Sequence, residues 1–572
     1  MRSTALLSPP GAAGAPAAPT PAARPAVPLA RWEPVLLLTL AMATEIAYVL
    51  GFVLPYGLAP SYTQPLLDLN RLNGHTPISA NYFAVTWAVS FAAMYIAYRR
   101  CPAYPQRSYF LVLGGAALVF NCTLLLMYPT GAADLFDQIF RARELAVYGK
   151  NPFLYPPADP LFAQDAFRKY VGGWASTTSP YGPVWELLAA GTAWLAGADL
   201  WRALLFFKGL VILAYAGSAM LIYATLWRVR PGWAARGLLF FAWNPLILWE
   251  TAGNGHNDMV MVFFTLLSLY LLARGPRAAL WAPAALALGV LSKFVPVLLL
   301  PILLVAIWQE RRPSGAAAWA VPVHEGWFRA TTAVLLGAAG FLVIAIVLYA
   351  PFWQGPSTIG ALTRRDLFTA SIPEVIKDSM AGPQMPGDDG EAPAFVKNLL
   401  AGDQVLREAE AMDRVRTWST WVVALTVFVS TAWLVLRTQA GDRQGILEGA
   451  FGACYNIFFI YLVFGTLWFQ PWYQSWLIAL TPLTARLPPV KRTLVMNAGG
   501  VANYFVWDFL VLWNMSWGIV VQWTAALAVN LPVLLYTVYQ WLVPPSRARD
   551  EEPAAQDVSQ HGDKGITSYD SE

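Results

Sequence analysis

Two aspartates follow an apolar run and begin a polar segment with the sequence YPTGAADLFDQIFRAREL. Asp134 and Asp137 are three residues apart and share one face if the segment is helical. Arg141 follows Asp137 by four residues and can neutralise it, which leaves Asp134 without an obvious local partner. A carboxylate of this kind can act as a general base, with Asp137 supporting it. The alternative is a capped helix start with a salt bridge.

A second polar group opens another apolar run in the sequence WETAGNGHNDMV, which contains Glu250, His256, Asn257 and Asp258. Helix capping accounts for one such residue, because Asn and Asp are good N-caps, but not for a consecutive series. A helix N-terminus also attracts anions, so His256 can give a proton or a positive charge to a phosphate. Lys293, in LSKFVPVL, is a further candidate phosphate ligand, with snorkelling to the membrane surface as the alternative.

Aromatic side chains gather in the same regions, and one motif, WFQPWYQSW, combines them with an amide. An aromatic belt at the membrane surface would explain them. In a sugar-binding cleft they would instead stack on pyranose rings. The candidate substrate-binding residues are Tyr155, Tyr181, Trp185, Glu250, Asn257, Asp258, Gln470, Trp472 and Tyr473.

The composition decides the class of protein in which these residues must be positioned. Apolar residues make up 57% of the 572 residues and charged residues only 13%, and the mean hydropathy is +0.47. Soluble domains are about 25% charged, so the chain is predicted to be an all-α polytopic protein of the lipid bilayer. A net charge of +4 gives no indication of a nucleic-acid partner. Three cysteines form no zinc pattern, and the sequence has no ATP-binding GxxxxGK[ST] motif.

Apolar runs predict about 14 transmembrane helices, with a range of 13 to 15. Lys and Arg cluster in alternate turns, and the positive-inside rule places these turns and both termini in the cytoplasm. A further run at 183–198 would invert every later turn, so we interpret it as an amphipathic helix in the interface. The fourteen runs are 33–56, 80–98, 108–127, 203–227, 236–250, 258–274, 278–292, 294–310, 329–353, 416–437, 446–467, 473–486, 493–512 and 519–542.

This topology places most of the unusual polar residues at the extracytoplasmic rim. An ionisable group at membrane depth costs at least about 2.5–3.5 kcal/mol, so their convergence predicts one polar cavity. The expected organisation is a disordered Ala/Pro-rich cytoplasmic tail (1–31), two additional N-terminal transmembrane helices (32–107), a core with a catalytic extracytoplasmic loop at 128–202 (108–353), a second extracytoplasmic loop (354–415), C-terminal transmembrane helices (416–543) and a disordered acidic cytoplasmic tail (544–572).

The sequence resembles the membrane glycosyltransferases of the C-type fold that use polyprenyl-phosphate sugars. It is most similar to the polyprenyl-phosphomannose-dependent α-1,6-mannosyltransferases. In that family an acidic residue near the start of the first large outer loop is the general base, which corresponds to Asp134. The family often has Gly directly before this Asp, whereas here the residue is Ala133, so Asp137 stays a second candidate. The matching pieces, in the family's order, are GAADLF (131–136), GKNPF (149–153), SPYGPVW (179–185), NPLILWE (244–250), GHNDM (255–259) and QPWYQSW (470–476).

The resemblance implies transfer of a sugar, expected to be mannose, from a polyprenyl-phosphate donor to a glycan or lipid-linked acceptor. The transfer would invert the anomeric carbon on the extracytoplasmic side of a bacterial plasma membrane. One carboxylate base suffices, and His256, Lys293 and Arg141 would bind the donor phosphate. No cofactor is implied, although two carboxylates three residues apart can hold a divalent cation weakly. The alternatives are a transporter or flippase of lipid-linked sugars, for which the sequence shows no internal repeat, and a non-catalytic scaffold.

Overall fold

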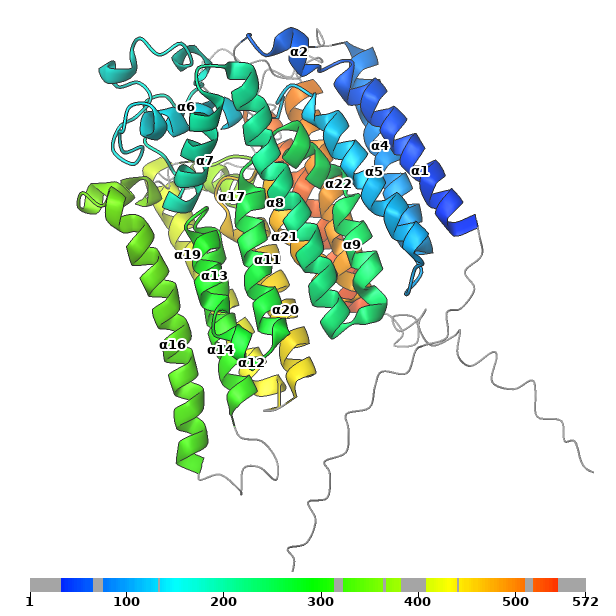
Figure 1. Ribbon diagram of the computed structural model, residues 1–572, viewed down its shortest axis with the longest axis vertical. Helices are drawn as coiled ribbons and strands as arrows, with labels where there is room; N and C mark the ends of the chain where they lie inside the picture. Colours follow the sequence, from blue (N-terminus) through cyan, green and yellow to red (C-terminus); the bar gives the residue numbers. More distant parts are fainter. Residues whose placement is uncertain are drawn as a thin grey trace, which may run out of the picture.

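The computed structural model describes residues 32–64, 72, 76–131, 134–312, 323–363, 367–381, 408–439, 442–509 and 518–543. Within these ranges the structure consists of helices and two isolated β-bridges, which join Gly57 to Met127 and Thr369 to Trp468. Most of the long helices run side by side as a bundle (Figure 1). A helical bundle satisfies its backbone hydrogen bonds internally, as a lipid environment requires. The predicted tails at 1–31 and 544–572 lie outside the described residues.

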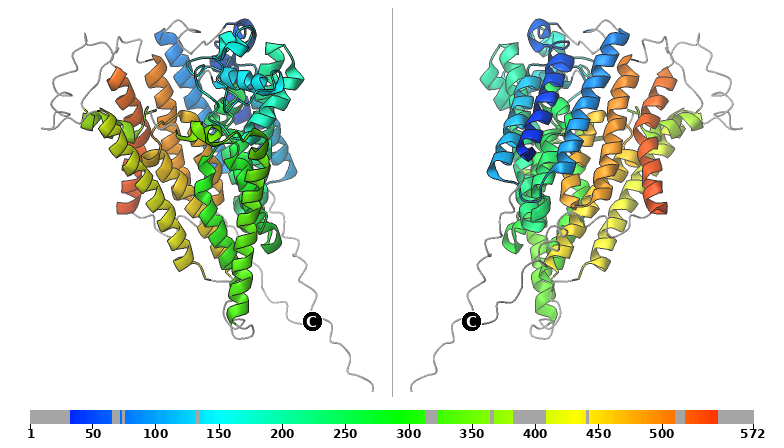
Figure 2. Two further views of the ribbon diagram at one scale, coloured as in Figure 1. Left: turned by 90° about the vertical axis from the view of Figure 1, so that its left-hand side faces the viewer. Right: turned by 90° about the vertical axis from the view of Figure 1, so that its right-hand side faces the viewer.

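Eight helices in the described part of the chain are long and apolar enough to cross a membrane. The least covered of them are α16 and α19, whose large apolar side chains, such as Ile346 and Phe428, face outward. α16 also extends furthest at the end of the bundle away from α6 (Figures 1 and 2). The eight are α1 (Trp32–Tyr48) with η1 (Val49–Val53), α4 (Pro77–Arg100), α5 (Arg107–Leu125), α8 (Leu200–Val229), α16 (Val323–Tyr349), α19 (Glu408–Arg437), α20 (Arg443–Ile460) and α23 (Gly518–Leu542).

The six other predicted runs also hold helices, but these are short or less apolar, so the predicted total of 14 spans is not confirmed. Prolines interrupt several of them, because proline lacks the N–H that a continuous helix needs. They are α9 (Ala234–Ala242) with α10 (Pro245–Leu248), α11 (Asp258–Arg274), α12 (Pro276–Ala279) with α13 (Ala282–Val290), η6 (Val295–Leu299) with α14 (Leu300–Arg311), α21 (Gln474–Leu480) with η11 (Thr481–Thr484), and α22 (Leu487–Phe509).

Local sequence fixes where several of these helices begin. The hydroxyl of Thr76 accepts a hydrogen bond from the Ser79 N–H at 3.2 Å and starts α4, with Pro77 in the first turn. The Asp199 carboxylate accepts from the Arg202 N–H at 3.1 Å and starts α8. The Asn244 side chain accepts from the first N–H groups of α10 and restarts the chain after α9. Polar caps therefore turn nearly continuous apolar sequence into separate helices.

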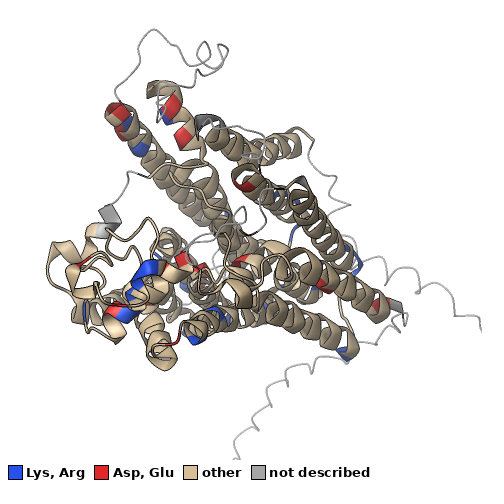
Figure 3. Cartoon of the chain, turned by 90° about the horizontal axis from the view of Figure 1, so that it is seen from above, with Lys and Arg blue, Asp and Glu red and all other residues tan. Residues whose placement is uncertain are grey.

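The arginine-rich turns lie at the end of the bundle opposite to α6 (Asp134–Ala146) and α7 (Pro183–Ala196) (Figure 1). Arg100 and Arg107 flank the turn between α4 and α5, and Arg228 and Arg311 close α8 and α14. Seen from above, the helices carry few charged residues, which gather at helix ends and near the centre (Figure 3). The fold therefore separates a basic end from the end that carries the aspartates.

The segment between α5 and α8 forms a packed cap built on α6 and α7. Within it Arg143 forms an ion pair with Asp165 at 2.8 Å, and Tyr148 donates to the same carboxylate at 2.9 Å. At about 1.5 Å per residue the 14-residue α7 is about 21 Å long, too short for a hydrocarbon core of about 30 Å. This length agrees with the predicted non-spanning helix at 183–198. α7 docks at the end of α13, where the Val184 N–H donates to the Leu291 carbonyl at 2.9 Å.

The docking of α7 on α13 depends on Gly182, whose added Cβ would lie 2.1 Å from the Leu291 carbonyl oxygen. Because a backbone atom cannot move away easily, we expect Gly182→Ala to destabilise the protein by about 1–3 kcal/mol. The measurement is the unfolding temperature in detergent. Gly191→Ala is the matched control, since a Cβ there meets nothing within 4 Å. Unfolding of the Gly182 variant at the wild-type temperature would contradict this contact.

Candidate active site

A cavity of about 420 Å³ lies where α6 meets the loops between the later helices. Its wall combines residues from segments far apart in the sequence, among them Trp174 and Thr177 of the cap and Trp468 before η10 (Pro471–Tyr473). Eight of the lining residues are site residues predicted from the sequence, namely Asp134, Asp137, Arg141, Tyr181, Lys293, Gln470, Trp472 and Tyr473. The structure thus brings the aspartates, the lysine and the aromatic motif to one cavity.

Asp134 is the first residue of α6 and is partly exposed to the cavity. Among the described residues its carboxylate has no hydrogen-bond or ion-pair partner. Burial, followed by the negative charge of Asp137, raises the pKa of Asp134 to about 7. The charges of Lys293 and Arg141 act in the opposite direction, and that of Asp258 adds to the rise. A carboxylate that titrates near neutral pH suits general-base chemistry.

Asp137 is distinguished from Asp134 by its ion pair with Arg141. The Arg141 Nε lies 2.7 Å from Asp137 Oδ2, so the pair predicted from the spacing is present. The same guanidinium donates to the carbonyls of Thr177 at 2.7 Å and Trp174 at 3.1 Å. With only 1% of its surface exposed, Arg141 is already committed to these partners. Its position therefore favours holding α6 and the cap together over binding a donor phosphate.

Lys293 follows α13 and points its ammonium group into the cavity region. Its Nζ lies 2.8 Å from Asp258 Oδ1 and 4.6 Å from the ring centre of Tyr473. The buried Asp258 carboxylate also accepts a hydrogen bond from Trp476 Nε1 at 2.6 Å. Asp258 therefore lies behind the cavity wall and orients Lys293, which corrects the prediction that it is a substrate-binding residue.

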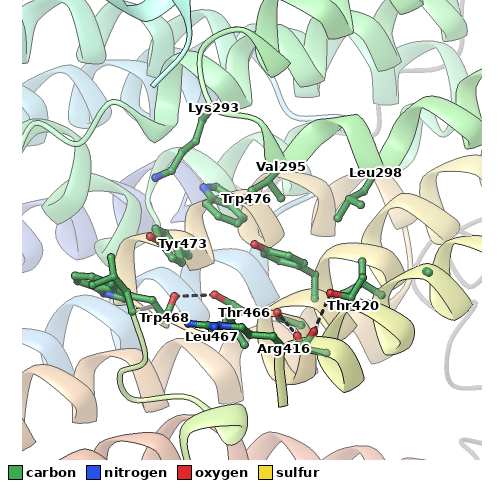
Figure 4. A pocket seen from close by; sticks show the side chains of 16 residues that line it. Lys293, Val295, Leu298, Arg416, Thr420, Thr466, Leu467, Trp468, Tyr473 and Trp476 are labelled. Carbon is green, nitrogen blue, oxygen red and sulfur yellow. Dashed lines mark hydrogen bonds between the residues drawn. The ribbon is translucent and has the colours of Figure 1, made fainter. Parts of the chain in front are cut away.

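A second cavity, of about 560 Å³, adjoins the first. Figure 4 shows Lys293 and Arg416 on opposite sides of it, with aromatic rings between them. Val295 and Leu298 add an apolar part to its wall. Lys293 and Tyr473 line both cavities, so the Lys293 side chain borders each of the two spaces.

Arg416 lines the second cavity and is not among the site residues predicted from the sequence. It lies in the first part of α19 and forms an ion pair with Asp413 at 2.8 Å. The sequence held a signal for it. Arg414 and Arg416 stand at the end of an apolar run that was placed outside the cytoplasm, where the positive-inside rule disfavours basic residues.

The other predicted site residues line neither of the two cavities. His256 is buried, with its ring stacked on Trp472 at a centroid distance of 4.1 Å. Its Nε2 is 3.4 Å from a carboxylate oxygen of Glu250, which is also buried. The structure thus places His256 as support for an aromatic wall and not at the surface where a phosphate would bind. The predicted residues that line neither cavity are Tyr155, Trp185, Glu250, His256, Asn257 and Asp258.

A metal site would need several ligands close together. Within the described residues no group of three or more His, Cys, Asp or Glu is arranged to hold a metal ion. Two carboxylates near α6, those of Asp137 and Asp258, instead form ion pairs with Arg141 and Lys293.

Comparisons with known proteins agree with the motifs. Residues 39–309 match the family model described as the N-terminal domain of alpha-(1->6)-mannopyranosyltransferases. A Mycolicibacterium smegmatis protein described as a probable alpha-(1->6)-mannopyranosyltransferase is 24% identical over 528 residues, which cover 87% of each chain. No solved structure matches the chain. The predicted resemblance is therefore confirmed: the chain is similar to the alpha-(1->6)-mannopyranosyltransferases.

Proposed function

We propose that this protein is a membrane mannosyltransferase that transfers mannose from a polyprenyl-phosphate donor to a glycan or glycolipid acceptor. The similarity to alpha-(1->6)-mannopyranosyltransferases indicates the sugar and the type of reaction. The observation that carries the proposal is the cavity in which the Asp134 carboxylate, which has no partner among the residues that the structure describes, faces the same space as the Lys293 ammonium group. A base and a cation in one cavity are what such a transfer requires.

The reaction is a direct displacement at the anomeric carbon. The acceptor hydroxyl oxygen forms a bond to this carbon while Asp134 takes the hydroxyl proton. The bond between the anomeric carbon and the phosphate oxygen breaks on the opposite face, and polyprenyl phosphate leaves with the electron pair. The configuration therefore inverts. Because phosphate is a weakly basic leaving group, Lys293 needs to stabilise its charge and does not need to donate a proton.

The two adjoining cavities suit the two parts of the donor. The first holds Asp134 together with Trp472 and Tyr473, whose rings can stack on a pyranose. The second combines Lys293 and Arg416 with apolar side chains, which suits a phosphate followed by a lipid chain. Because Lys293 lines both cavities, the phosphate would bind at their junction, next to the sugar.

α6, whose residues line the first cavity, lies at the end of the bundle opposite to the arginine-rich turns (Figure 1). The positive-inside rule places those turns in the cytoplasm. This arrangement supports an active site on the extracytoplasmic side of a bacterial plasma membrane, where a lipid-linked donor presents its head group and the acceptor arrives from the aqueous side.

The first test replaces the proposed base. We expect Asp134→Asn and Asp134→Ala to lower the transfer rate by about 10²–10⁴-fold, because a general base contributes that much. The assay measures transfer of labelled mannose from polyprenyl-phosphomannose by the purified protein. Asp199→Asn is the control, since Asp199 is exposed and Asn preserves its helix cap. Near wild-type rates in both Asp134 variants would refute the assignment.

The pH dependence gives an independent test of the same residue. Since the pKa of Asp134 is raised to about 7 and the base acts when deprotonated, kcat/KM should rise with pH through about 7 and level off above it. Asp137→Asn removes a negative charge that raises this pKa, so the rise should move to lower pH. The measurement is kcat/KM for the acceptor at pH values where the protein stays folded. A rate independent of pH across this region would contradict the proposal.

The third test concerns the donor phosphate. Lys293→Gln should raise the KM for the donor by about 10–100-fold, because a hydrogen bond to a charged group contributes about 1.5–3 kcal/mol. The KM for the acceptor should change much less. Lys169→Gln is the matched control, since Lys169 is exposed on the cap and lines neither cavity. An unchanged donor KM in the Lys293 variant would show that its ammonium does not bind the phosphate.

A further inference from the structure

A chain of three buried side chains connects α22 to the segment that leads into α6. The Tyr504 hydroxyl donates to one oxygen of Glu250 at 2.6 Å, and the Asn254 amide nitrogen donates to the other oxygen at 2.9 Å. The Asn254 amide oxygen then accepts from the backbone N–H groups of Thr130 at 3.1 Å and Gly131 at 3.0 Å. The chain therefore ends on the backbone three residues before Asp134.

The hydrogen bonds along this chain of side chains can run in one direction only. Both Glu250 oxygens accept hydrogen bonds, so the Asn254 amide must turn its nitrogen toward Glu250 and its oxygen toward the backbone. Gly131 allows the close approach, because an added Cβ would lie 2.5 Å from Asn254 Nδ2 and 3.0 Å from the Tyr504 hydroxyl. Every member of the chain therefore specifies the position of its neighbour.

The segment between α5 and α6 has two separate anchors. Its first part is held by the Leu58 N–H, which donates to the Leu126 carbonyl at 2.7 Å, and by the Tyr128 N–H, which donates to the Tyr56 carbonyl at 2.7 Å. Asn254 instead holds Thr130 and Gly131, at the end nearest to Asp134. Loss of the Asn254 contact would thus release the part of the segment that delivers the carboxylate.

We propose that Glu250, acting through Asn254, is a positioning residue that sets where the Asp134 carboxylate stands in the cavity. Neither Glu250 nor Asn254 lines either of the two cavities described above, so neither contacts the groups that react there. This inference rests on the proposal that Asp134 is the base. It assigns to Glu250 a role different from the substrate contact predicted from the sequence.

The test uses Glu250→Gln, which keeps the size of the side chain and reverses the polarity of one end. The new amide has a single acceptor oxygen, so it cannot accept from both Tyr504 and Asn254. If its N–H groups face Asn254, the Asn254 amide can no longer direct its oxygen to the backbone; if they face Tyr504, the hydroxyl loses its acceptor and must itself accept. We expect kcat to fall by about 10–100-fold with a donor KM within about threefold of wild type, because small misplacements of a catalytic group have effects of this size. The rise of kcat/KM with pH should also move to lower pH, since a displaced Asp134 is less buried.

Two further measurements keep the test independent of folding and of the base assignment. Hydrogen exchange of the backbone amides at 127–138 in the full-length protein in lipid nanodiscs should become faster in Glu250→Gln. Tyr504→Phe, which removes one hydroxyl, should show the same changes at a smaller size, with kcat lower by about 2–10-fold. Tyr455→Phe is its matched control, because Tyr455 is also buried and donates to the Pro489 carbonyl at 3.2 Å, away from this chain.

The outcomes separate the positioning role from its alternatives. Unchanged exchange and unchanged kcat in Glu250→Gln would overturn the inference. Faster exchange with normal kcat would also overturn it, since Asp134 would then not depend on the segment. A lower rate that tracks the amount of folded protein, with the wild-type pH profile, would show a merely structural role. If Asp134→Asn is active while hydrogen exchange in Glu250→Gln changes as expected, Asp134 is not the base, but Glu250 and Asn254 still hold the segment in place.

Discussion

An ionised side chain beside a membrane core is costly unless an opposite charge or hydrogen bonds replace its lost water. The structure meets this constraint at most charged groups near α6. Asp137 pairs with Arg141, and Asp258 pairs with Lys293. Glu250 receives hydrogen bonds on both oxygens. Asp134 differs, because among the described residues it faces the cavity without such a partner, and this difference makes it the reactive carboxylate in our account.

The N-terminal helices contribute to the position of this carboxylate. From the sequence, residues 32–107 are predicted to be an addition before the core. In the structure the chain after η1 hydrogen-bonds to the segment between α5 and α6 through Leu58 and Tyr56. α1 also packs against α4 and α5. The family match begins at residue 39 and so includes most of α1. These helices therefore help to fix the start of the segment that carries Asp134.

The sequence was sufficient to predict a helical membrane protein and the segments that form its cavity. Asp134, Lys293 and Trp472 were predictable from their residue types and from their predicted position at one side of the membrane. Charged and aromatic residues at an apolar rim are uncommon unless they have a functional or structural role. The number of spans was harder to predict. The central helices, such as α13 and α21, are short and begin or end near a proline, and they pack against protein on most sides, so hydropathy alone does not define them.

The orientation of individual side chains could not be predicted from the sequence. A π-helical turn, η5 (Trp249–Gly253), and a left-handed Gly255 with φ of +72° separate Glu250 from His256. Such irregular backbone changes which way each residue points, and this explains why both lie behind the wall. Arg416 was missed for a different reason. It contributes to the site because α19 packs near Lys293 in the folded protein, and no local sequence motif indicates this proximity.

The central claim is that the Asp134 carboxylate reaches the acceptor hydroxyl beside a donor held at Lys293. A cryo-electron microscopy structure with a non-reactive phosphonate analogue of the donor and a bound acceptor measures this directly. The account predicts a carboxylate oxygen of Asp134 within hydrogen-bond distance of the acceptor oxygen, about 2.6–3.2 Å, and the phosphonate beside Lys293. An acceptor oxygen held by another carboxylate, with Asp134 turned away from the anomeric carbon, would contradict it.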